Sequence, residues 1–434
     1  MADDKQLAAA RRMIAALREV IDLPFCLRLW DGSIEPLGQN VTEGLAVVVR
    51  HPGVVTSILR RPGLERILRH YASGMIDFEG GTLIDFGRPL VFLRSRSALK
   101  RIPKKAIFDF ARAFFFAEPL PAGASRVYAG DETGAPKGRS KDDDRRFIEF
   151  HYDLSNTFYE LFLDERMVYT CGYFTDWQNG IDAAQHDKLE MICRKLRLKE
   201  GERFLDIGCG WGALVCHAAE HYGVEAKGVT LSTEQYEYAR AKVKRMGLED
   251  RVTIELKDYT HLDETFDKIS SIGMMEAIGI ANTDVYFGTV RRLLADKGLF
   301  LNHAISRKAK KRQTRFSSRP EQRMLQKYIF PGGELDDLGH TIEAAERHGF
   351  EVMDVEGWRE HYQRTTELWC RRLTANREAA IAEVGEEAYR IWVAYLGGVS
   401  LAFMRGSARL YQTLVSKNPK GPTQLPPTRA DLYR

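Results

Sequence analysis

The sequence has few of the features that mark secreted or membrane-spanning proteins. Its 6 cysteines include no Cys-x-x-Cys pair and lie near no histidine cluster. This spacing argues against a disulfide framework and against a structural zinc site. No apolar run approaches the roughly 18 residues that cross a bilayer, and the first residues, MADDKQLAAARRM, lack the apolar core of a signal peptide. We therefore expect a cytoplasmic protein that can touch a membrane without crossing it.

Neither sign of charge is in large excess, because the chain has 64 lysines and arginines and 60 aspartates and glutamates. The net charge of +4 is too small to indicate nucleic acid as a ligand of the whole chain. Hydrophobic residues make up 44% and charged residues 29%, which is usual for a soluble protein with a buried core. The length of 434 residues predicts two domains, or one domain with a large extension.

The first part of the chain, residues 1–120, reads as a small α+β domain. Apolar residues recur at helical spacing in residues 5–21. The runs that predict strands and a second helix are FCLRLWDGSIEPL, with a turn signal at Asp31-Gly32, then GLAVVVRH and GLERILRHYASGMIDFEGG. Residues 121–146 are rich in glycine, proline and charge, so we interpret them as a linker.

A different pattern fills residues 147–434. Strand-like runs alternate there with helical runs of about 10–15 residues, which is typical of a parallel sheet covered by helices. The strand-like runs are ERFLDI, EAKGVTLS, VTIELKD, FDKISSIGMMEAIG and GLFLNHAI. We therefore expect an α/β domain in this part.

Glycine is concentrated where the first of these strands meets the first helix. Gly208, Gly210 and Gly212 alternate there, and Asp206 precedes them by two residues. Glycine allows a tight turn and a close approach of ligand to backbone, and the following helix offers free N–H groups. A purely structural turn is the alternative. No Asp or Glu closes the next strand, VTLS, where a dinucleotide enzyme holds its ribose, so a different cofactor is favoured.

The run DIGCGWG resembles the first motif of class I S-adenosylmethionine-dependent methyltransferases. The resemblance implies a Rossmann-like α/β fold with a mostly parallel seven-stranded sheet, in which the glycine turn lies against the methionine part of the cofactor. Asp258, after the third strand, is then expected to accept from the adenine amino group, although it can equally be a residue that ends a strand. The candidate cofactor-binding residues are Tyr169, Thr170, Asp206, Gly208, Gly210, Trp211, Gly212, Thr230, Leu231, Ser232, Gln235, Asp258 and Tyr259.

Further motifs narrow the resemblance to one family. HYDLSNTFYELFLDERMVYTCGYF, FLDIGCGWG, GVTLSTEQ, GMMEAIG, KYIFPGGEL and HYQRTTELW follow the order seen in cyclopropane-fatty-acyl-phospholipid synthases. The resemblance covers about 145–417, and residues 1–120 resemble the lipid-binding N-terminal domain of the bacterial enzymes. It implies that the tyrosine-rich run at 151–174 is a lid over the cofactor and part of an acyl channel. Ordinary core or surface packing of these tyrosines is the alternative.

The reaction implied by the family adds a methyl carbon to a cis double bond and then removes a proton to close a ring. A base is therefore needed in an apolar pocket, and the resemblance implies a bound bicarbonate ion for this task. Taken alone, a histidine after a strand is usually structural, and a cysteine can be a small buried apolar residue. The residues implied as ligands of the ion are Cys171, Glu276, His303, Ile305 through its backbone, and Tyr362.

The sequence departs from the family pattern beside the expected base, because Ala277 follows Glu276 where histidine is usual. The product therefore stays open between a cyclopropane ring and a methyl-branched or methylene chain. A lipid carrier without activity is a third alternative.

Residues 307–327 contain nine basic residues and one acidic residue, Glu321. A solvated loop is the ordinary interpretation, but such a segment also suits anionic phospholipid headgroups better than nucleic acid. We expect the protein to act on phospholipid at the inner face of the membrane, peripherally attached. The family resemblance also implies a possible homodimer.

Overall fold

The computed structural model describes residues 2–93, 100–120, 154–309, 333–418, 420–423 and 425–433. These residues divide into two compact units: Met1–Tyr128 with Cys370–Leu401, and Ala129–Trp369 with Ala402–Arg434. The expected linker at 121–146 lies outside the described residues, as does most of the basic segment at 307–327. The domain boundaries drawn from the sequence stay a prediction.

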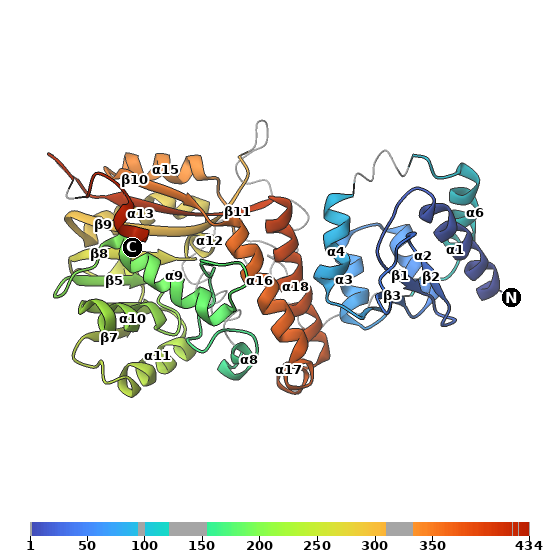
Figure 1. Cartoon of the computed structure of the whole chain (residues 1–434), viewed down its shortest axis with the longest axis horizontal. Coiled ribbons are helices and arrows are strands. Elements are labelled where there is room, and N and C mark those ends of the chain that lie inside the picture. Colours follow the sequence, from blue (N-terminus) through green and yellow to red (C-terminus); the bar gives the residue numbers. More distant parts are fainter. Residues whose placement is uncertain are drawn as a thin grey trace. The chain divides into compact units, whose positions relative to one another are not determined.

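The first unit contains a four-stranded sheet in the order β2-β1-β3-β4. Figure 1 labels β1, β2 and β3 of this sheet and the helices of the same unit. β1 and β2 pair antiparallel, and the Asp31-Gly32 turn predicted from the sequence joins them. The strands are β1 (Cys26–Arg28), β2 (Ile34–Pro36), β3 (Ala46–Val49) and β4 (Ile76–Glu79). The helices are α1 (Ala2–Arg18), α2 (Pro52–Arg60), α3 (Leu64–Ala72), α4 (Leu83–Phe92) and α6 (Lys104–Phe115).

Residues 370–401 complete the first unit. They comprise the end of α16 (Arg359–Ala375), α17 (Arg377–Val384) and most of α18 (Glu386–Arg405). Arg390 of α18 donates two hydrogen bonds to Asp77 of β4, over 3.1 and 3.0 Å, and its guanidinium lies over the ring of Tyr71. The Arg390 side chain is only 6% exposed. This largely buried ion pair therefore links the N-terminal part of the first unit to residues 370–401.

The second unit is built on a seven-stranded sheet in the order β10-β11-β9-β8-β5-β6-β7. The strands from β9 to β7 are parallel, and β11 runs antiparallel to both neighbours, so the mostly parallel sheet expected from the sequence is confirmed. The strands are β5 (Arg203–Ile207), β6 (Glu225–Thr230), β7 (Val252–Leu256), β8 (Phe266–Ile272), β9 (Leu294–Arg307), β10 (Glu351–Gly357) and β11 (Ala408–Ser416).

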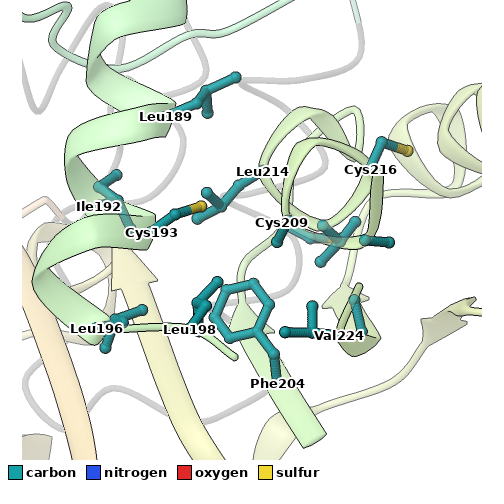
Figure 2. Packing of buried hydrophobic residues seen from close by; sticks show 14 of the residues in the cluster. Leu189, Ile192, Cys193, Leu196, Leu198, Phe204, Cys209, Leu214, Cys216 and Val224 are labelled. Carbon is teal, nitrogen blue, oxygen red and sulfur yellow. The ribbon is translucent and has the colours of Figure 1, made fainter. Parts of the chain in front are cut away.

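Helices cover both faces of this sheet. Their bounds are α8 (Asn156–Glu160), α9 (Ile181–Leu196), α10 (Ala213–Tyr222), α11 (Thr233–Arg245), α12 (Met275–Ile278), α13 (Thr283–Leu293) and α15 (Leu338–Arg347), with short 3-10 turns η1 (Tyr259–His261), η2 (Ile280–Asn282) and η3 (Ala430–Tyr433). Alternate residues of β5 face opposite layers, since Phe204 packs with α9, α10 and α11, and Leu205 with α13 and α15. Figure 2 shows the first layer, where α9 packs against Phe204 and Leu214.

Two local features of the second unit determine where Glu276 and Glu356 lie: the end of β8 and a bulge in β10. The run FDKISSIGMMEAIG is a strand only as far as Ile272, because Gly273 has a φ of 75° and α12 begins two residues later, so the expected single strand is wrong. The pairing of β10 with β11 shifts by one residue between Val352 and Asp354. This bulge brings Glu356 opposite Gln412.

All six cysteines are free thiols. Among the described residues, no helix is long and apolar enough to cross a bilayer. In the same part of the chain, no group of three His, Cys, Asp or Glu side chains is placed to share a metal ion.

Candidate active site

The glycine turn lies between β5 and α10, at the carboxyl edge of the parallel strands. Gly208, Gly210 and Gly212 have φ values of 78°, 53° and 78°, which other residues seldom adopt. A Cβ on Gly208 would lie 2.2 Å from the sulfur of Met274, whereas one on Gly210 would meet no atom within 4 Å. The turn is therefore packed behind Gly208 and open at Gly210. Gly212 is the N-cap of α10, and no side chain caps the free N–H groups of that helix.

Asp206 lies buried at the end of β5, next to this turn. Ser270 of the neighbouring strand β8 donates its hydroxyl hydrogen to Oδ1 of Asp206 over 2.6 Å. Burial raises the pKa of Asp206 to about 6, and the hydrogen bond from Ser270 and the charge of Lys188 oppose this rise. The carboxyl group is thus held in one orientation beside the glycines.

The end of β6 is tied to the same turn, because the N–H groups of Gly208 and Cys209 both donate to the carbonyl of Val229. The candidates Thr230, Ser232 and Gln235 bind one another there: Thr230 Oγ1 donates to Gln235 Oε1 over 2.8 Å, and Ser232 Oγ caps α11 by accepting from the Gln235 N–H. Leu231 lies between them, half-buried. These contacts fix the loop that the sequence assigned to the cofactor.

Asp258 follows β7 and caps the η1 turn. Its Oδ1 accepts from the N–H and the hydroxyl of Thr260, both over 2.8 Å. Tyr259 packs its ring against Tyr286, with 6.1 Å between centroids. Asp258 therefore has the strand-end role allowed as an alternative, and its Oδ2 takes no part in this turn.

The tyrosine-rich run packs on the glycine turn through aromatic rings. Tyr159 of α8 is fully buried and lies 5.1 Å from Trp211 and 5.4 Å from Tyr169, between ring centroids. Trp211 also donates its indole N–H to Asn156 over 2.6 Å. Tyr169 in turn lies 5.3 Å from Trp369. The run is thus an aromatic wall beside the turn, anchored by buried rings.

Two residues of α9 that sequence reasoning missed hold Thr170. Gln185 donates to the Thr170 carbonyl over 2.8 Å, and Lys188 donates to the Thr170 hydroxyl over 3.1 Å. Both side chains are buried, and burial lowers the pKa of Lys188 to about 8, against the charges of Asp164 and Asp206. No sequence signal distinguished this lysine from the surface lysines of other helices.

Trp358 brings together three of the residues implied as ligands of the ion. The Cys171 thiol lies 3.1 Å from the Gly172 carbonyl and 4.0 Å from that of Trp358. The rings of His303 and Trp358 are 5.6 Å apart, and the Tyr362 N–H donates to the Trp358 carbonyl. Tyr362 stacks its ring on Phe403, 4.8 Å away.

Ile305 and Glu276 form the other part of this group. The Ile305 N–H donates to Oε1 of Glu276, and Ile305 lies two residues beyond His303 on β9, so both side chains are on the same face of that strand. Of the two nitrogens of His303, Nδ1 is bonded to Gln412 and not to Glu276.

Two buried polar atoms of this group have no hydrogen-bond partner among the described residues: Glu276 Oε2 and His303 Nε2. Burial raises the pKa of Glu276 to about 7, and the hydrogen bond from Ile305 opposes the rise. Burial, and then the charges of Lys188 and Lys195, lower the pKa of His303 well below its ordinary value, so its ring is neutral. Burial also raises the pKa of the Cys171 thiol well above its ordinary value. His303 and Cys171 are therefore uncharged, and Glu276 can gain or lose a proton near neutral pH.

Comparison with known proteins identifies the family of this chain. Residues 139–413 match the protein family described as mycolic acid cyclopropane synthetase. A probable fatty acid methyltransferase of Pseudomonas putida is 36% identical over 423 residues, which are 95% of this chain and 97% of that protein. This chain belongs to the mycolic acid cyclopropane synthetase family.

The cyclopropane synthetase family is a family of S-adenosylmethionine-dependent lipid methyltransferases. The cyclopropane-fatty-acyl-phospholipid synthase of Escherichia coli strain K12 is 38% identical over 267 residues, 62% of this chain and 66% of that protein. A solved structure of a mycolic acid cyclopropane synthase, complexed with SAH and CTAB, matches with a TM-score of 0.60 and 33% identity, over 63% of this chain and 98% of that one.

The residues of this family member fit the cofactor. The open space at Gly210 and the free N–H groups of α10 suit a ligand at the turn, and Asp258 retains a carboxyl oxygen for a donor. His303 Nε2 and Glu276 Oε2, which have no hydrogen-bond partner among the described residues, are a ring nitrogen and a carboxyl oxygen with which a small polar ligand could bond.

Proposed function

We propose that this protein transfers a one-carbon unit from S-adenosylmethionine to the cis double bond of an unsaturated phospholipid acyl chain and forms a cyclopropane ring. The observation that carries the proposal is a pair of buried polar atoms, on Glu276 and His303, that have no hydrogen-bond partner among the described residues of a methyltransferase fold. Proton removal inside an apolar pocket needs such groups, and a simple lipid carrier does not.

S-adenosylmethionine supplies an electrophilic methyl carbon when it is bound. Attack by the π electrons of the double bond would form a bond to that carbon as its bond to sulfur breaks. S-adenosylhomocysteine would leave as a neutral thioether, and the positive charge would pass to the acyl chain. A proton must then leave the added carbon, so that its C–H electrons can close the ring. The aromatic wall of Tyr159, Tyr169 and Trp211 would exclude water, which would otherwise capture the cation.

We also propose that bicarbonate binds beside His303 and Glu276. His303 Nε2 and the Tyr362 hydroxyl would hold the ion, and Glu276, with a pKa of about 7, would share a proton with it. The ion would supply the base, because the lowered pKa of His303 makes its ring a weak base and the Cys171 thiol is protonated.

A second product has specific support. The Pseudomonas putida relative carries the description of a fatty acid methyltransferase, and Ala277 stands beside the base where the family usually has histidine. A hydride shift from the methyl-bearing carbon to the cationic carbon, followed by loss of a proton from the added carbon, would give a methylene lipid. Reduction of its double bond by another enzyme would give a methyl branch.

The deciding experiment incubates purified protein with S-adenosylmethionine, bicarbonate and vesicles of a monounsaturated phospholipid. Mass spectrometry then detects addition of CH₂, and proton NMR of the extracted lipid separates ring hydrogens from vinylic ones. Ring hydrogens support the first proposal, and a methylene signal supports the second. Unchanged lipid, from protein that binds S-adenosylmethionine, would overturn both and favour a carrier.

We propose that α6 attaches the protein to the surface that presents this lipid. Phe108 and Phe115 are 65% and 48% exposed, and Phe116, directly after the helix, is 81% exposed. Lys104 and Arg112 lie at helical spacing from these rings and are exposed too. Exposed aromatic rings between basic side chains are complementary to an anionic bilayer, where each nearby cation contributes about 1 kcal/mol.

Replacing both Phe108 and Phe116 by serine should weaken binding to vesicles that contain an anionic phospholipid, because the inserted rings are lost. Cosedimentation measures this. Ile34→Ser is the matched control, since Ile34 is 53% exposed but lies on β2. Equal loss in the control, or binding that is insensitive to salt, would contradict attachment through α6.

A further inference from the structure

Three polar residues form a row across the edge of the seven-stranded sheet. Glu356 of β10 is opposite Gln412 of β11, and Gln412 is opposite His303 of β9. Side chains of directly opposed residues share one face of a sheet, so the row lies on a single face. It is the face of α9, because Leu301 of β9 and Leu414 of β11 pack with that helix.

Lys195 of α9 is placed over this row and binds two of its members. Its ammonium donates to Glu356 Oε2 and, over 2.7 Å, to Gln412 Oε1. It also lies 5.2 Å from the centre of the Trp358 ring. The Lys195 side chain is 1% exposed, so its ammonium is satisfied by protein groups alone and not by solvent.

An ammonium group can only donate, so the Gln412 atom that faces Lys195 must be the oxygen. The amide nitrogen of Gln412 consequently faces His303, 3.1 Å from Nδ1. An amide nitrogen can also only donate, so Nδ1 must be the acceptor. A neutral imidazole whose Nδ1 accepts carries its hydrogen on Nε2, the ring nitrogen that is buried without a protein partner.

We propose that Glu356, Lys195 and Gln412 act as positioning residues that fix His303 as an Nε2–H donor toward the bound acceptor of the site. This inference rests on the proposed function for the identity of that acceptor, an oxyanion. The row makes the site selective for a ligand that accepts a hydrogen bond at this point. It also prevents His303 from taking up a proton on Nδ1.

The test reads the ring directly. Protein labelled with ¹⁵N in its histidine rings gives long-range ¹H–¹⁵N spectra that distinguish the Nε2–H tautomer from the Nδ1–H tautomer. The His303 signals are assigned by their loss in His303→Asn. Wild-type protein should show Nε2–H. Gln412→Glu should move the hydrogen to Nδ1 or protonate both nitrogens, because a carboxylate in this place accepts from Nδ1–H.

The matched control is Asn302→Asp. It makes the same amide-to-carboxylate change in the residue that precedes His303 on β9. Asn302 faces the other layer of the sheet, where its side chain accepts a hydrogen bond from the Tyr286 hydroxyl. This variant should keep the Nε2–H signals. If Gln412→Glu fails to fold, Lys195→Met replaces it: the amide is then free to turn, both tautomers should appear, and Lys195→Arg should restore the wild-type spectrum.

Kinetics give the second readout. Gln412→Glu should lower kcat by about 100-fold, the range expected when a catalytic hydrogen bond is misdirected, with a much smaller change in KM for S-adenosylmethionine. An Nδ1–H signal in wild-type protein would overturn the proposal, as would a spectrum that stays unchanged in both Gln412→Glu and Lys195→Met. The spectra need no turnover, so they remain decisive even if the lipid assay detects no product.

Discussion

At the scale of single residues, the site depends on carboxyl, imidazole and thiol groups whose protonation is set by burial. Glu276 has one oxygen bonded to Ile305 and one without a partner, although the rest of the residue is partly exposed. The neighbouring ring of His303 is neutral, and the Cys171 thiol is protonated. Glu276 is therefore the group that can change its charge near neutral pH.

Glu276→Gln should abolish methyl transfer but leave S-adenosylmethionine binding, because the carboxyl is not at the glycine turn. It should also alter the pH dependence of stability. The unfolded carboxyl releases its proton near 4.5 and the folded one near 7, so the folded protein binds more protons between these values. The free energy of unfolding should fall by about 3 kcal/mol as pH rises through this window.

Urea titrations at several pH values measure this effect. The fall should be smaller by about 3 kcal/mol in Glu276→Gln, where the raised pKa of Asp206 still contributes a fall of its own. It should be unchanged in Glu343→Gln, which alters an exposed carboxyl on α15. The same fall in all three proteins would show that other groups cause it.

At the scale of elements, the turn between β5 and α10 presents the cofactor site. The three glycines have positive φ, yet only Gly210 borders open space that a side chain would fill. The effect of a positive φ can therefore be separated from the effect of lost ligand space. The comparison needs a second glycine that has a positive φ but lies away from the turn.

Gly210→Ala should raise the Kd for S-adenosylmethionine by about tenfold or more, since its methyl group would project into the space of the ligand. Gly247→Ala is the control, because Gly247 has a φ of 66° and is also free of neighbours, but it lies after α11. Each change should cost about 1–2 kcal/mol of stability through the left-handed backbone. Isothermal titration calorimetry compares the two, and equal affinities would place the ligand elsewhere.

How much of these elements the sequence predicts depends on how local their signals are. The strand, glycine turn and helix around Gly208 follow one another in the chain, and their pattern predicts both fold and cofactor. Gln412 and Lys195 are 217 residues apart, and each is of a type found on any protein surface. Their meeting depends on strand register and on the side of the sheet that α9 covers, which no local pattern encodes. The family resemblance supplied His303 but not the residues that orient it.

At the scale of the whole molecule, the first unit is assembled from both ends of the chain. Asp77 of β4 binds Arg390 of α18, 313 residues later, and Asp85 binds Arg371 in the same unit. Residues 1–120 thus lack part of their own unit when they are taken alone.

Asp77→Ala should destabilise the first unit by about 3 kcal/mol, because it removes the main partner of a buried guanidinium. Asp31→Ala is the control: it breaks an exposed pair with Arg11, which solvent screens, so its loss should destabilise the unit much less. Urea unfolding followed by circular dichroism measures both. Equal effects would mean that the Asp77–Arg390 pair does not tie the unit together.

The one-residue bulge in β10 has a consequence for how this chain tolerates change in length. Side chains alternate between the two faces of a strand, so Glu356 meets Gln412 only because an extra residue precedes it. Deleting Met353, or inserting one residue into β11 before Gln412, would exchange inward and outward positions at the sheet edge. The deletion would separate Glu356 from Gln412, and the insertion would change the register of Gln412 with its neighbours. In both cases every amino acid of the row would still be present. Homologues that keep this row should therefore vary in composition along β10 and β11, but not in the number of residues between the bulge and the row.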